Sequence, residues 1–406
     1  AEAQIELANR TIILPTNLAL NRLKWIRRNK DKQNLSNQNV KLNFTNSMFS
    51  SLQALPISSF KKISTSKSKN NSNKKYFYWS EGSISIGRIG DTSISSTKKT
   101  HTDSLTFGFD RFRDDYGIDG FAFRFGEDVT DVGNAGSNLD SNTYNITYYR
   151  TSPIKNDTKY VDKIFGVGRI KTDLLNVLDS KYLTAKRTGH QIYGTLKIKD
   201  EYKKDNLILI PSGQFDFGHT ILNGYQEVGA GGAAGAIDVE EQHVRTRNVR
   251  ATMALVEDLS NDKYTFKRHG KLEYVADIDR SSNFTYVYVS DRGRTFYETL
   301  DTGAFHNLNG EIGIDLIFPE HLSTFIVYER NHAFGAGYTD NIYITFGYLP
   351  HNDTEYALSI NGSDNLISKF EIKKNINGYD LNFYLNDDLT NLGNNKEASI
   401  NLNKVF

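Results

Sequence analysis

The chain has 406 residues, of which 38% are apolar and 12% aromatic, and it contains no cysteine. This composition excludes a disulfide scaffold and any zinc or iron–sulfur site with cysteine ligands. No apolar run approaches the roughly 18–20 residues of a membrane-spanning helix, but a transmembrane β-barrel stays open because its strands alternate apolar and polar residues.

Charge is distributed unevenly along the chain. Residues 1–75 carry 14 Lys and Arg against 3 Asp and Glu, a net charge of +11, whereas the other 331 residues carry 35 against 45, a net charge of −10. An asymmetry of this size indicates two parts with different roles. The plain alternative is a solvated basic tail on a mildly acidic domain.

The first predicted element is a helix within residues 1–30, kinked or broken at Pro15. A cap at Thr16 or Asn17 would begin its second half, where apolar residues recur at helical spacing. That half also carries four cations: Arg22, Lys24, Arg27 and Arg28. Residues 31–75 are predicted to be a linker, because they end in the run KKISTSKSKNNSNKK, which cannot bury a core.

From Tyr76 to Phe406 the sequence alternates with period two. The segment 192–199, for example, places Ile, Gly, Leu and Ile on one face and Tyr, Thr, Lys and Lys on the other. Such alternation predicts strands with one apolar and one polar face. About sixteen stretches of this kind are counted. They begin near residues 76, 103, 116, 142, 160, 188, 206, 246, 264, 311, 322, 341, 355, 366, 379 and 397. A further stretch, 284–289, is expected to form a loop hairpin.

The predicted connections differ in length. Tight turns are expected at 114–115 and 377–378, and long polar loops over 89–102, 127–141, 219–245 and 290–310. Short turns at one end and long loops at the other are typical of a transmembrane barrel, as are aromatic residues at strand ends. A soluble β-sandwich would also alternate and is kept as an alternative.

Single charges stand in the middle of several predicted strands. In a membrane barrel they would face the lumen. The candidates are Glu81, Asp110, Arg124, Arg250, Glu273, Asp277 and Asp315. A helix over residues 3–28 would be ~39 Å long and would cross an apolar band of about 25 Å. Its cations would then meet wall carboxylates at reduced dielectric. The sequence therefore predicts a helix that plugs the lumen, against the alternatives of solvated charges or binding to anionic lipid.

The last ten residues, EASINLNKVF, form an alternating strand interrupted at Lys404. A terminal strand that ends in Phe resembles the insertion signal of outer-membrane barrels. We expect Leu402 and Phe406 to carry that signal.

Several segments resemble the autotransporter (type V secretion) β-domain. YFYWSEGSISIG (76–87) looks like its first strand, and DSLTFGFDRFRDDYGIDGFAFRFG (103–126) resembles its second and third strands. LILIPSGQFDFGHTILNGYQEVGAGG (207–232) is the sharpest match, and ANRTIILPTNLALNRLKWIRRNK (8–30) resembles the segment that joins passenger to barrel. The resemblance implies an all-β fold, an antiparallel up-and-down barrel of twelve strands over 76–406 with a helix in its lumen. The strand count leaves fourteen or sixteen strands open.

The resemblance also implies a function. The protein is expected to be an outer-membrane translocator of a Gram-negative bacterium that anchors and exports an N-terminal passenger to the cell surface. Its expected partners are outer-membrane lipid, the barrel-assembly machinery during insertion and its own passenger, with a monomeric barrel and no nucleic acid. The alternatives are an outer-membrane porin, a surface adhesin and a soluble β-sandwich binding module.

Catalytic and metal-binding motifs are sought in the sequence without success. The nine histidines show no ligand spacing. GDTS (90–93) lacks the Asp and His partners of an esterase, DIDR (277–280) is too short for a calcium loop, and GAGGAAG (229–235) lacks the Lys of a phosphate loop. We therefore expect no enzyme activity, no cofactor and no metal site.

Overall fold

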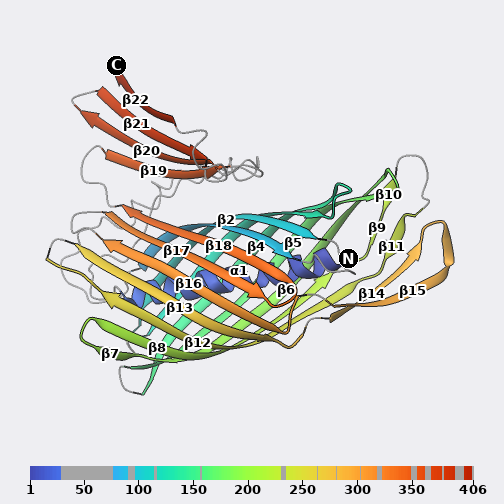
Figure 1. Ribbon diagram of the computed structural model, residues 1–406, viewed down its shortest axis with the longest axis horizontal. Helices are drawn as coiled ribbons and strands as arrows, with labels where there is room; N and C mark the ends of the chain where they lie inside the picture. The colour runs from blue at the N-terminus through green and yellow to red at the C-terminus, as the bar shows by residue number, and fades with distance from the viewer. Residues whose placement is uncertain are drawn as a thin grey trace.

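The computed structural model contains a helix and three antiparallel sheets (Figure 1). It describes residues 1–28, 76–89, 97–113, 117–155, 158–229, 235–262, 264–279, 281–301, 303–317, 322–348, 354–361, 367–376, 379–388 and 397–404. The predicted linker over 31–75 lies outside these ranges.

Twelve of the described strands form a closed barrel. They are β1 (Tyr76–Ile89), β2 (Lys98–Phe112), β3 (Ile118–Val132), β4 (Ser137–Lys155), β5 (Lys159–Leu178), β6 (Lys181–Asp200), β8 (Leu207–Leu222), β12 (Gln242–Asp258), β13 (Thr265–Asp277), β16 (His306–Ile317), β17 (Leu322–Ala333) and β18 (Gly337–Tyr348). Each pairs with its neighbour in chain order, and β18 returns to β1 with Gly82 opposite Ile344. Closure removes the free sheet edges, and the twelve-stranded prediction is confirmed.

The two faces of the wall are inverted relative to a soluble sheet. On β6, Ile192 and Ile198 point outward and are 50% and 53% exposed, whereas Thr195 and Lys197 point inward and are buried. A β-sandwich would bury its apolar residues against a second sheet. An apolar exterior around a polar interior is instead the arrangement of a barrel surrounded by lipid.

The helix α1 (Glu2–Arg28) runs along the barrel lumen (Figure 1). Its 27 residues make it about 40 Å long. The predicted break at Pro15 is wrong, because α1 is continuous through that residue, and Thr16 and Asn17 lie inside the helix and do not cap it. Nowhere in the described ranges is there a helix whose length and apolar character would let it span a membrane.

A second sheet lies at the barrel end where α1 begins (Figure 1). It has the order β15-β14-β11-β9, from β9 (Tyr225–Gln226), β11 (Ile237–Val239), β14 (Ser281–Tyr288) and β15 (Asp291–Asp301). We call it the loop sheet. The stretch 284–289, expected to form a hairpin by itself, lies mostly in β14, which pairs with β15. The predicted loop over 290–310 is wrong, because it contains β15 and the start of β16. Two short strands, β7 (Tyr202–Lys204) and β10 (Val228–Gly229), extend the barrel sheet at its margins.

The predicted loop over 127–141 is wrong. β3 and β4 continue through most of it and are joined by a tight turn, in which Gly133 and Gly136 have φ angles of 65° and 92°. Glycine adopts such angles at no steric cost. The outward residues here include Glu127 and Asp140, so β3 and β4 extend beyond the apolar band of the barrel. The polar residues of these strand ends were mistaken for those of a loop.

The third sheet corrects the predicted barrel boundary at residue 406. β19 (Thr354–Asn361), β20 (Ile367–Ile376), β21 (Tyr379–Asp388) and β22 (Glu397–Lys404) pair only with one another within the described residues. Leu402 lies in β22 and is therefore not in the last barrel strand, while Phe406 lies outside the described residues. The barrel is already closed at β18, and period two fits any two-faced sheet. The four surplus stretches of the sequence count are these four strands.

Candidate functional site: the helix-filled lumen

Among the ion pairs between α1 and the described wall residues, Arg22–Asp110 is the most deeply buried. Arg22 Nε lies 2.7 Å from Asp110 Oδ2 and Nη2 lies 3.2 Å from Oδ1, and the side chains are 2% and 1% exposed. The Tyr149 hydroxyl donates to the same carboxylate at 3.1 Å, and Trp79 Nε1 donates to Tyr149 at 2.8 Å. The guanidinium also lies 4.9 Å from the centre of the Trp25 ring. A bidentate pair of this kind fixes both the position and the rotation of the helix.

The last turns of α1 make further contacts with the wall. Lys24 Nζ lies 2.9 Å from Glu311 Oε2, and Arg28 binds Asp315 through Nε at 2.6 Å and Nη2 at 2.9 Å. Arg27 differs from the other three predicted plug residues. It donates to the Thr151 hydroxyl, and its guanidinium lies 3.3 Å from the centre of the Tyr160 ring.

The first turns of α1 carry contacts that the sequence did not reveal. Arg10 Nε lies 3.0 Å from Asp128 Oδ1. The charges are reversed at the very start of the helix, where Lys98 of β2 reaches Glu2 at 2.9 Å and Glu6 at 3.0 Å. Asp128 is four residues after Arg124 on the same strand, so alternation places both on the inner face. The sequence alone does not tell which residue of α1 lies opposite Asp128.

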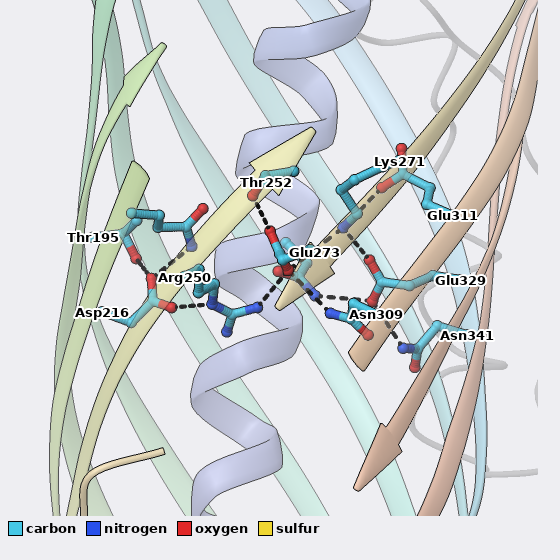
Figure 2. Close-up of polar contacts among 12 residues, drawn as sticks. Thr195, Asp216, Arg250, Thr252, Lys271, Glu273, Asn309, Glu311, Glu329 and Asn341 are labelled. Atoms are coloured by element: carbon cyan, nitrogen blue, oxygen red, sulfur yellow. Dashed lines mark hydrogen bonds and ion pairs between the residues drawn. The ribbon is translucent and has the colours of Figure 1, made fainter. Parts of the chain in front are cut away.

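A second network joins the inner faces of β8, β12, β13, β16, β17 and β18 beside α1 (Figure 2). Arg250 lies between Asp216, at 2.5 Å, and Glu273, at 3.1 Å. Lys271 contacts Glu329 at 2.9 Å and Glu311 at 3.1 Å. Thr252, Asn309, Asn341 and Asn17 donate further hydrogen bonds to Glu273 or Glu329.

The seven predicted wall residues all lie on the inner face. Asp110 and Asp315 bind cations of α1, and Arg250 and Glu273 bind one another. Glu81 and Arg124 are buried, and Arg124 donates to Thr143 at 3.1 Å. Asp277 is half-buried and lines a cavity beside α1. The wall is less acidic than the sequence suggested, because Lys98, Arg187, Lys197, Lys199 and Lys271 also point inward.

Two small cavities lie beside α1 among the described residues. One, of about 140 Å³, adjoins the first half of the helix, and another, of about 70 Å³, adjoins its last two turns. Since a water molecule takes up about 30 Å³ of liquid, each holds a few waters. The arrangement is that of a barrel whose interior is filled by its own helix.

Comparison with known proteins shows which family the barrel resembles. The family model of the autotransporter beta-domain matches residues 78–329. The translocator domain of the autotransporter NalP from Neisseria meningitidis is similar in structure, with a TM-score of 0.54, 13% identity, and coverage of 69% of this chain and 90% of that chain. The beta domain of the Bordetella autotransporter Brka has a TM-score of 0.48 and 12% identity, covering 67% and 98%.

No curated protein matches the chain. The family model nevertheless spans β1 to β17 almost completely, and the twelve-stranded fold is the one that the resemblance implied. The chain belongs to the autotransporter β-domain family.

Proposed function

We propose that this protein is an outer-membrane translocator that anchors and exports an N-terminal passenger to the surface of a Gram-negative bacterium. The observation that carries the proposal is α1 threaded along the lumen and held by ion pairs at both ends. A segment that had just followed a passenger through the pore would occupy this position. Its first residue lies beside the loop sheet, at the end where the barrel carries its largest connections.

The proposed partners follow from the apolar exterior and the closed sheet of the barrel. Outer-membrane lipid would cover the apolar exterior, and the assembly machinery would act during insertion. The closed barrel sheet offers no edge strand for pairing with another chain, which favours a monomeric barrel. We propose no enzymatic role, because the buried acids and cations of the lumen are largely engaged with one another.

Surface display tests the proposal. A folded reporter fused ahead of Ala1 should become accessible to protease added to intact cells, while the barrel stays in the membrane fraction. The matched control carries the same fusion with β18 deleted, so that the wall cannot close. A reporter that remains in the periplasm although the barrel is folded in the outer membrane would reject the translocator function.

A porin is the strongest rival and predicts the opposite electrical behaviour. An open pore would show steady conductance, whereas α1 fills the lumen and the two cavities described above are small. The conductance of the intact chain in planar bilayers therefore separates these two functions.

A further inference from the structure

The cavity of about 70 Å³ beside the last two turns of α1 is rich in cations. It is bounded by β5, β6, β8, β12, β13 and β16. We call it the lysine cavity, after four lysines that line it: Lys24, Lys197, Lys199 and Lys271. Among its other lining residues, Arg27 and Arg28 come from the end of the helix and Glu201 comes from the connection after β6, so the cavity lies toward that end of the barrel.

Three of the four lysines have an acidic partner. Lys199 Nζ lies 2.8 Å from Asp162 Oδ2. Lys24 and Lys271 share Glu311, at 2.9 Å and 3.1 Å. Asp162 and Glu311 are thereby occupied, and Glu201, the third acid that lines the cavity, is half-buried.

Lys197 is the exception. The residue is 5% exposed and lines the cavity, and its side chain has no hydrogen bond or ion pair with any described residue. The nearby carboxylate of Glu273 is taken by Arg250 at 3.1 Å and by the hydroxyl of Thr252 at 2.7 Å. A buried ammonium needs acceptors for its three N–H groups and a balancing charge. The neighbouring lysines add to the positive potential, and they supply neither hydrogen-bond acceptors nor a negative charge.

We propose that the lysine cavity is a binding site for a small inorganic anion, of chloride to phosphate size, with Lys197 as its principal ligand. The cavity has room for a few waters or one such anion. Charge-assisted hydrogen bonds from an ammonium are stronger than neutral ones. The bound anion would supply the balancing charge for Lys197 and join the end of α1 to the barrel wall.

Thermal unfolding of the full chain in detergent tests the site. The melting temperature is measured against chloride and phosphate at constant ionic strength, with gluconate, which is too large for the cavity, as the balancing anion. We expect a rise of roughly 2 °C for each tenfold increase in chloride or phosphate above its dissociation constant. No rise relative to gluconate would overturn the proposal.

The variants K197M and K186M test whether the anion-dependent rise in melting temperature comes from Lys197. Met has a similar length without the charge, so K197M should lose the anion-dependent rise and should melt higher than the wild type in gluconate alone. Lys186 is on the same strand but 86% exposed on the outside, so K186M should behave as the wild type. A rise that persists in K197M would overturn the assignment.

Diffraction provides a measurement that does not depend on a variant folding. Wild-type crystals soaked in bromide should show an anomalous peak within hydrogen-bonding distance of Lys197 Nζ. Bromide found only elsewhere in the protein would exclude this site.

Discussion

Asn145 of the barrel wall donates its side-chain amide, at 3.5 Å, to the backbone carbonyl of Thr11 in α1. In an α-helix this carbonyl would accept from residue 15, which here is a proline without an N–H group. The wall therefore compensates for the missing helical bond. Gln191 reinforces the same turn by donating to the carbonyl of Ala8 at 3.0 Å and to the hydroxyl of Thr11 at 2.8 Å.

This relationship predicts a measurable coupling between Asn145 and Pro15. N145A should destabilise the folded barrel by about 1 kcal/mol through this bond, and by less in a P15A background, where the helix regains its own donor. The double-mutant cycle is measured by urea unfolding in lipid vesicles. Because Asn145 also accepts from Arg124, the cycle and not the single variant carries the test. Strict additivity would contradict the compensation.

The Arg22–Asp110 pair should contribute far more to the free energy of unfolding than a solvent-exposed pair. Removing one partner, as in D110N, leaves a buried charge uncompensated and should cost about 3–5 kcal/mol of unfolding free energy. The control is D173N, because the pair of Asp173 with Lys186 is solvent-exposed and should cost about 0–1 kcal/mol. Equal losses in the two variants would show that the lumen is as well solvated as the surface.

Removing α1 should open the lumen. Deletion of residues 1–28 is expected to raise single-channel conductance in planar bilayers and to lower the melting temperature, because both the filling and the ion pairs are lost. Substituting Gln for Arg22, Lys24, Arg27 and Arg28 should have the same effects more weakly, since the helix backbone would still occupy space. Unchanged conductance after the deletion would mean that α1 does not plug the barrel.

Truncation at the C-terminus separates the barrel from the third sheet. A chain ending at Tyr348 keeps all twelve barrel strands and should still show heat-modifiable mobility on gels. A chain ending before Gly337 loses β18 and leaves β1 and β17 with unpaired edges, so it should fail to fold. If the first truncation also fails, β19–β22 are needed for folding of the barrel.

The sequence predicted the barrel well because alternation is a local property. A strand such as β6 has the same two faces whatever its neighbours are. What alternation cannot tell is which strands share a sheet, so the four strands after Tyr348 were assigned to the barrel. The partners in the ion pairs between α1 and the wall were missed for a related reason. The contact of Arg10 with Asp128 spans 118 residues, and only the closed barrel determines that they meet.

The ion pairs along α1 also differ in sign between its two ends. Acids at its start, Glu2 and Glu6, meet a cation of the wall, and cations at its end, Lys24 and Arg28, meet acids. Negative charge at the start and positive charge at the end also complement the helix dipole. A shift of one turn, about 5.4 Å, would separate all these pairs together, and an inverted helix would place like charges against each other. A chain moving outward through the barrel would therefore have one stopping depth and one direction in which it can stop.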